Sequence, residues 1–121
     1  MDDRAYYHGG VPGMFPGRVL LPPSMTSFQR EHAARVRSGS VGRADRVYIT
    51  TSLESAAMYA ALYPRRSGGS VYRVEPIGLL EDDPDCDEPG LSFACARARI
   101  IERVRIPRAA IVDLREELAR G

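Results

Sequence analysis

Three short stretches of the sequence carry side chains that could hold a small molecule or act on it. His8 is followed by Gly9 and Gly10 in "YYHGG", and Tyr48 shortly precedes two threonines in "VYITT". Acidic residues are concentrated in "EDDPDCDE" at 81–88. An aromatic ring can stack on a flat cationic ligand, and a carboxylate can stabilise developing positive charge or take a proton. Each stretch also has a plainer interpretation: a histidine in a turn, a tyrosine in a core, and a solvated acidic loop.

The acidic stretch does not fit a calcium loop. Asp83, Asp85 and Asp87 alternate as the first ligands of an EF-hand do, but Glu88 stands where that loop needs glycine and Ala94 where it needs a closing glutamate. Cys86 and Cys95 match neither a CxxC nor a zinc spacing. We therefore predict no metal site and no disulfide framework.

Composition limits the classes of protein that the chain can represent. Its 121 residues suffice for one compact domain, 1–121, with a formal net charge of +1. A balanced charge gives no general attraction to nucleic acid or to an anionic membrane. We see no leader segment and no long apolar run, and we expect reduced thiols in a cytoplasmic protein.

The first half of the chain alternates short strands with helices. "RAYYHG" predicts a strand that ends in a tight turn at the glycines, and at most a short strand fits residues 19–21. Residues 24–37 have apolar side chains at helical spacing. "RVYIT" predicts a strand that runs into a helix ending at Pro64, with Thr51 and Glu54 as a capping box. The apolar face of that helix is predicted to consist of Leu53, Ala56, Ala57, Ala60 and Ala61.

The second half predicts two further strands and one ambiguous segment. "SVYRVEP" is typical of a strand closed by Pro76, and 77–90 reads as a loop rich in proline and glycine. "RIIERVRI" alternates, which places Ile100, Val104 and Ile106 on one side of a half-buried strand. The last residues, 109–121, fit either a strand or a short helix. We expect an α+β fold on an antiparallel sheet.

The three stretches, taken in order, resemble a known family. "YYHGG", "VYITTSLESAAMYAAL" and "VYRVEPIGLLEDDPD" are similar to the rifamycin (rifampin) ADP-ribosyltransferases, and the resemblance runs from about Ala5 to the strand near Arg105. It implies an ADP-ribosyltransferase-like split β-sandwich with a few short helices around an NAD cleft. The most specific part is the pattern of Pro, Gly and acids from "VEP" to "EDDPD".

The resemblance also assigns roles to residues. It implies that His8 binds ribose hydroxyls of NAD, that the Gly9 backbone holds the nicotinamide amide, and that Tyr48 stacks on the nicotinamide ring. It places the catalytic acid at Asp83, with Asp82 as the neighbouring alternative. These residue types suit the chemistry, because breaking the nicotinamide–ribose bond builds positive charge on the ribose, which a carboxylate can stabilise.

The chain departs from the family pattern at three places, one of which is a longer and more arginine-rich connection between the first strand and "VYIT". Gly10 stands where the family has Thr after His-Gly, and the loop after "EDDPD" is shorter, with only Ser92 and Phe93 of its later part. The leading expectation is transfer of ADP-ribose from NAD to a hydroxyl of a small molecule, such as a rifamycin-type antibiotic. The alternatives are a toxin-like or regulatory transferase acting on protein or nucleic acid, through the arginines before Tyr48, and an inactive NAD-binding domain.

Overall fold

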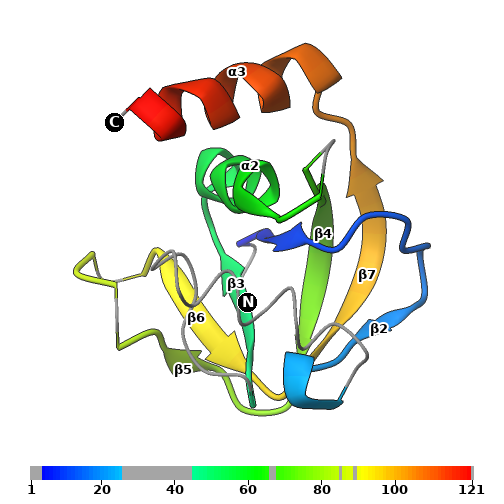
Figure 1. The fold of residues 1–121 in the computed structure, drawn as a ribbon. Helices are drawn as coiled ribbons and strands as arrows, with labels where there is room; N and C mark the ends of the chain where they lie inside the picture. The colour runs from blue at the N-terminus through cyan, green and yellow to red at the C-terminus, as the bar shows by residue number, and fades with distance from the viewer. Residues whose placement is uncertain (1–3, 26–44, 66–67, 85, 89, 121) are drawn as a thin grey trace.

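The computed structural model describes residues 4–25, 45–65, 68–84, 86–88 and 90–120 (Figure 1). A one-turn 3-10 helix, η1 (Pro23–Met25), stands where the helix of residues 24–37 was predicted to begin. The rest of that predicted helix lies outside the described residues.

The described strands form one antiparallel sheet, and two helices pack on it (Figure 1). The strands are β1 (Tyr6–Gly10), β2 (Val19–Leu20), β3 (Val47–Thr50), β4 (Ser70–Ile77), β5 (Glu81–Asp82), β6 (Ser92–Cys95) and β7 (Arg97–Val104). Their order across the sheet is β2-β7-β4-β1-β3-β6-β5, and every pairing is antiparallel. The predicted α+β class on an antiparallel sheet is confirmed.

The sheet is almost divided between β1 and β3. Strand β1 pairs with β4 along its whole length, from Tyr6 opposite Val74 to Gly10 opposite Ser70. Its pairing with β3 consists of a single position, Tyr7 opposite Thr50. The two halves, β2-β7-β4-β1 and β3-β6-β5, therefore meet at one point, which makes the fold sandwich-like.

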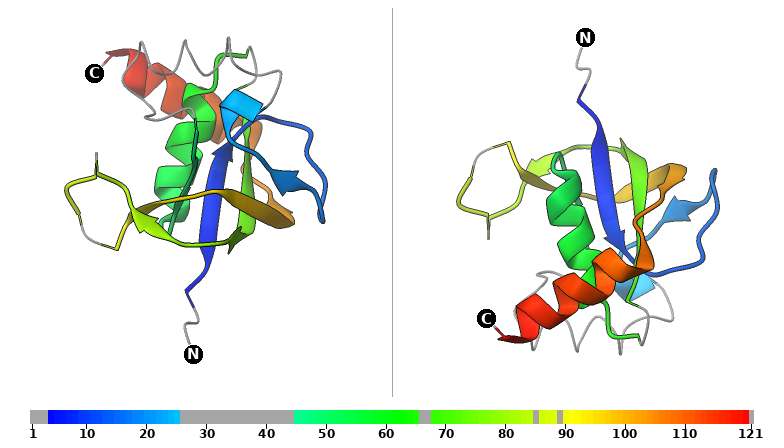
Figure 2. Two further views of the ribbon diagram at one scale, coloured as in Figure 1. Left: turned by 90° about the horizontal axis from the view of Figure 1, so that it is seen from below. Right: turned by 90° about the horizontal axis from the view of Figure 1, so that it is seen from above.

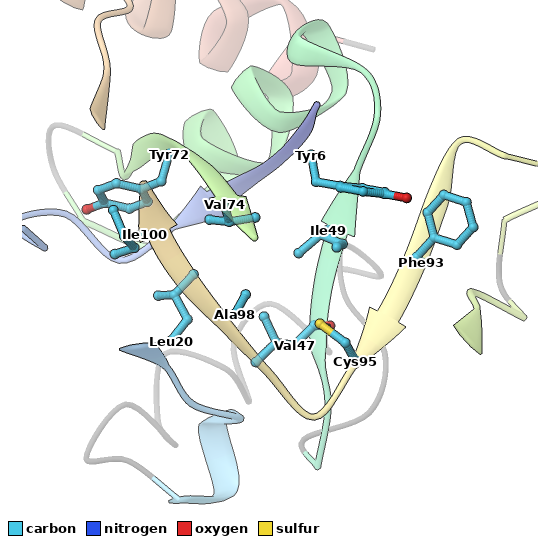
Figure 3. Packing of buried hydrophobic residues seen from close by; sticks show 10 residues of the cluster. All are labelled: Tyr6, Leu20, Val47, Ile49, Tyr72, Val74, Phe93, Cys95, Ala98 and Ile100. Atoms are coloured by element: carbon cyan, nitrogen blue, oxygen red, sulfur yellow. The ribbon is translucent and has the colours of Figure 1, made fainter. Parts of the chain in front are cut away.

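The main hydrophobic core fills the space that the two halves enclose (Figure 3). The rings of Tyr6 from one half and Phe93 from the other meet edge to face, with centroids 5.9 Å apart. Ile49 and Ile100 are each 1% exposed, and burial of such a side chain stabilises the fold by about 1.5–3 kcal/mol. The remaining members are Leu20, Val47, Tyr72, Val74, Cys95 and Ala98. This core holds the halves together where backbone hydrogen bonds do not.

A second, smaller core lies beneath the helices. Helix α2 (Leu53–Leu62) contacts β1, and α3 (Arg108–Arg120) lies against α2 (Figure 2). The buried face of α2 consists of four alanines, Ala56, Ala57, Ala60 and Ala61, as predicted, whereas Leu53 is 39% exposed. Small side chains let backbones approach closely, and the Gly69 amide donates a 2.6 Å hydrogen bond to the Ala60 carbonyl. None of the described helices is long and apolar enough to cross a membrane.

The start of α2 differs from the prediction. The N-cap is Ser52, whose Oγ accepts a 3.1 Å hydrogen bond from the Ser55 amide, so the predicted capping box of Thr51 and Glu54 is wrong. Thr51 instead donates its hydroxyl to the Gly90 carbonyl at 2.8 Å. The Thr51 hydroxyl is thus used in a hydrogen bond to a distant loop, and not in the helix cap that local spacing had predicted. The predicted end of the helix before Pro64 is confirmed.

A bulge in β7 reverses the faces of its second half. Arg73 pairs with Glu102 while the next residue, Val74, pairs with Ile100, so Ile101 is the extra residue. Ile100 therefore belongs to the main core and Val104 packs in the smaller core under the helices. The predicted placement of Ile100 and Val104 on one side is wrong, because the alternation assumed an unbroken strand.

Two strand ends and two additional strands also differ from the sequence prediction. Strand β1 continues through both glycines to Gly10, and β4 continues through Pro76 to Ile77, beyond the last residue of β4 that pairs with β1. Strand β5 lies inside the segment expected to be a loop. Strand β6 was missed, because all four of its residues are buried and no alternation marks it. The ambiguous C-terminal segment forms helix α3.

The two cysteines are expected to react very differently with a thiol reagent. Burial raises the pKa of the Cys95 thiol to about 11, and its Sγ lies 3.2 Å from the Arg97 carbonyl oxygen, while Cys86 is only half-buried. At pH 8 we expect Cys95 to react at least ~100-fold more slowly than Cys86. Stopped-flow labelling of the native protein checks this, and Cys86→Ser should remove the fast phase. A fast phase that survives in Cys86→Ser contradicts the burial of Cys95.

The raised pKa of Cys95 also fixes the sign of a pH effect on stability. The folded chain holds the thiol proton more tightly than the unfolded chain, so this contribution is complete below the ordinary thiol pKa and is lost as the pH rises toward about 11. Denaturant unfolding of wild type and Cys95→Ala between pH 7 and 10.5 should show the steeper loss in wild type.

Candidate active site

The imidazole of His8 bridges the gap between β1 and β3. Beyond the single pair of Tyr7 with Thr50 the two strands separate, and His8 Nδ1 lies 2.8 Å from the Tyr48 carbonyl oxygen. A carbonyl oxygen can only accept, so Nδ1 carries the proton in this hydrogen bond. The bond fixes the plane and the tautomer of the ring, and it leaves Nε2 as the nitrogen that can accept from a hydroxyl when the ring is neutral.

Two glycines follow His8, and the space around each explains in a different way why a side chain would not fit there. A Cβ at Gly9 would lie 1.9 Å from the Ala56 carbonyl oxygen, so the helix backbone itself requires glycine there. A Cβ at Gly10 would lie 2.6 Å from His8 Nε2, the end of a side chain. The imidazole therefore lies over Gly10, in space that any other residue would occupy.

Tyr48 is a half-buried residue on β3, opposite Ala94 of β6. Alternation along β3 places Tyr48 and Thr50 on the face away from the main core, which holds Val47 and Ile49. The Thr50 hydroxyl donates to the Leu91 carbonyl at 2.8 Å and accepts from the Ser52 amide at 3.0 Å. The end of β3 is thus fixed to both the following helix and the later loop.

Asp83 is held against β6, directly beyond β5. Its amide donates to the Ser92 carbonyl at 3.1 Å, and its Oδ2 accepts from the Ser92 hydroxyl at 2.8 Å. Ser92 is 8% exposed and pairs with Thr50. Asp83, Ser92 and Thr50 therefore form one row across three strands, on the same face as Tyr48. Two strand spacings of about 10 Å separate the backbones of Asp83 and Thr50.

Asp82 has a different environment from Asp83. It is exposed and lies opposite Phe93, whose ring belongs to the main core. Within the part of the chain that the structure describes, its carboxylate has no hydrogen bond or ion pair. The neighbouring Glu81 forms a half-exposed ion pair with Arg46 at 3.6 Å, which stabilises the fold by about 1 kcal/mol at most. Of the two aspartates, only Asp83 is fixed in place by another side chain.

The structure thus places the His8 ring against the backbone carbonyl of Tyr48, and it ties Asp83 to Ser92, the strand neighbour of Thr50. Sequence reasoning noted Ser92 and Thr50 without assigning these ties, because hydrogen bonds across forty residues leave no local pattern. The described residues contain no group of three or more His, Cys, Asp or Glu side chains arranged to hold a metal ion. A fixed imidazole, an aromatic side chain and an anchored carboxylate remain as the chemical groups of the site.

A family model described as rifampin ADP-ribosyl transferase matches residues 6–104, a stretch that begins at β1 and ends with β7. It includes His8, Gly9, Tyr48 and Asp83. A search of curated proteins finds no match.

Alanine at Gly9 and at Gly10 should have separable effects. Gly9→Ala is expected to lower the free energy of unfolding by about 3 kcal/mol, because its Cβ would overlap the Ala56 carbonyl oxygen and the helix must shift. Gly10→Ala should keep near-wild-type stability but displace the His8 ring from the Tyr48 carbonyl. Urea unfolding measures the first effect, and NMR of the imidazole protons measures the second. Equal stabilities of the two variants would show that α2 does not rest on β1 as described.

Proposed function

Because the chain belongs to the rifampin ADP-ribosyl transferase family, we propose that it transfers ADP-ribose from NAD to a hydroxyl group of a rifamycin-type antibiotic. Nicotinamide is the leaving group. The observation that carries the proposal is that, within the matched residues, the His8 ring is hydrogen-bonded to the Tyr48 backbone and the Asp83 carboxylate is held by Ser92.

The residues of the site fit NAD in their chemistry. The absence of a side chain at Gly10 leaves room for the His8 ring, and a neutral imidazole nitrogen can accept a hydrogen bond from a ribose hydroxyl. Tyr48 supplies an aromatic side chain for the cationic nicotinamide ring. The contact with α2 already explains why position 9 is glycine. Our assignment of the Gly9 backbone to the nicotinamide amide rests on the family resemblance.

Asp83 is assigned the central electrostatic role. NAD supplies the ADP-ribosyl group through breakage of its nicotinamide–ribose bond, with the bonding electron pair leaving on the nicotinamide nitrogen and positive charge building on the ribose. A carboxylate fixed beforehand by the Ser92 hydroxyl stabilises this charge without having to reorganise during the reaction. The second oxygen of Asp83 can orient the antibiotic hydroxyl, whose oxygen forms the new bond to the ribose carbon, and receive its proton.

The alternative acceptors suggested by the sequence have no comparable support. Of the arginines considered as a contact surface for protein or nucleic acid, Arg30, Arg35, Arg37 and Arg43 lie outside the described residues, and Arg46 forms an ion pair with Glu81 at 3.6 Å. We therefore retain one proposed function. A transfer of label from NAD to protein or RNA in a lysate, with no transfer to the drug, would replace it by the toxin-like or regulatory alternative.

The primary experiment follows nicotinamide release from NAD with and without rifampin. We expect the drug to increase the rate of release, and mass spectrometry should find the drug heavier by one ADP-ribose. A protein that binds NAD but gives no drug-dependent release contradicts the assigned acceptor. A protein that does not bind NAD contradicts the whole proposal.

Variants of the paired aspartates test the assignment of the acid. Asp83→Asn should lower kcat/KM for transfer at least ~100-fold, because the charge facing the ribose is lost. The matched control Asp82→Asn should stay within about twofold of wild type, since that carboxylate is exposed on the other face. Circular dichroism confirms that both variants fold. The opposite ranking would move the acid by one position.

The Ser92 hydroxyl is assigned as a positioning group for Asp83. Ser92→Ala should lower kcat about tenfold with little change in KM for NAD, because the carboxylate remains but is no longer held. Ser92→Thr, which restores a hydroxyl, should recover part of the loss. A change in KM alone would indicate that Ser92 acts on binding instead.

A further inference from the structure

A pocket rich in arginine lies at one end of the sheet, where β4 begins, β7 ends and α3 starts. It has a volume of about 390 Å³, and Arg65, Arg103 and Arg108 line it. The described residues that line it include no aspartate or glutamate. A concave site of this size with several guanidinium groups has the electrostatic character of an oxyanion site.

Two of the three arginines that line this pocket are unpaired within the part of the chain that the structure describes. Within the described residues, Arg103 and Arg108 form no ion pair and no side-chain hydrogen bond. Arg65 is held in place, because its guanidinium lies 5.6 Å from the centre of the Tyr63 ring and its carbonyl accepts from Arg115 Nη1 at 2.6 Å. Two guanidinium groups are thus available to a ligand, beside a third that is anchored.

A buried polar group in the wall of the pocket gives an independent indication. Ser70 lines the pocket and is only 7% exposed. Its hydroxyl has no hydrogen-bond partner among the residues that the structure describes. Buried hydroxyls are nearly always paired, with protein or with a bound molecule. The amides of the two neighbouring glycines are already used, since Gly68 donates to Arg65 and Gly69 to Ala60.

The pocket adjoins the proposed active site through the sheet itself. His8 pairs with Tyr72, and Tyr72 pairs with Arg103, so these three residues form one row and their side chains share a face. In the same way Gly10, beneath the His8 ring, pairs with Ser70. About 10 Å separates the backbones of His8 and Arg103, and an arginine side chain spans much of that distance.

We propose that this pocket binds the pyrophosphate of NAD, with Arg103 and Arg108 as its principal ligands. The inference rests on the proposed function, because it takes His8 as the residue that meets the nicotinamide ribose. The 5′ carbon of that same ribose carries the pyrophosphate, so the two phosphates must lie within a short distance of His8. Arginine forms paired, charge-assisted hydrogen bonds with phosphate oxygens.

The test measures ligand binding directly by titration calorimetry, without turnover. Wild type should bind inorganic pyrophosphate and NAD, and Arg103→Gln/Arg108→Gln should weaken both by about tenfold for each arginine removed. Arg99→Gln, on the same strand but outside the pocket, is the matched control and should change neither affinity by more than about twofold. Nicotinamide riboside, which lacks phosphate, should bind wild type and the double variant equally. Thermal unfolding verifies that each variant folds.

The outcomes separate this inference from the proposed function. If wild type shows drug-dependent nicotinamide release but the double variant binds NAD normally, the pyrophosphate assignment is overturned and the transferase stands. If the double variant loses pyrophosphate binding while its affinity for NAD is unchanged, the pocket serves another anion and the assignment is again overturned. If arginine-dependent binding of NAD and pyrophosphate occurs without any nicotinamide release, the anion site stands and the transferase does not.

Discussion

The arrangement of this molecule depends on how closely α2 approaches β1. The carbonyl of Ala56 occupies the position that a side chain at Gly9 would need, and four alanines form the face of the helix that makes this approach possible. Because α2 follows β3 after only two residues, the contact also determines where β3 ends. The end of β3 meets β1 at Tyr7, and the strands diverge from there. His8 occupies the opening, so the ring that we assign to ligand binding is placed by backbone packing behind it.

The acidic side of the site is positioned by hydrogen bonds rather than by packing. Thr50 and Thr51 hold the carbonyls of Leu91 and Gly90, and Ser92 holds Asp83. These side chains fasten Asp83, Gly90 and Leu91 to the same junction of β3 and α2 that the close helix contact fixes. One junction therefore orients both the imidazole and the carboxylate, although 75 residues separate His8 from Asp83 in the sequence (83 − 8).

Local pattern was sufficient for the parts of the fold that depend on local interactions. Strand β3 and α2 followed from a β-branched run, an alanine-rich face and Pro64. Prediction failed where distant partners decide the structure. The bulge at Ile101 is defined only against β4, β6 is buried on both sides and has no alternation, and Thr51 is used by a distant carbonyl. In the candidate site too, local pattern was not sufficient. The hydrogen bonds of Ser92 and Thr50 form only because β6 lies between β3 and β5.

The order of the strands has a consequence for how the chain reaches its native state. Strand β1 is the first of the described strands along the chain, yet it lies in the middle of the sheet, between β3 and β4. Its full-length partner, β4, is more than half the chain away, and β4 in turn pairs with β7 near the C-terminus. Such nonlocal pairing is slow to form. A nascent chain must keep "YYHGG" unpaired until most of the sequence has left the ribosome, which makes this segment the one most exposed to mispairing during synthesis.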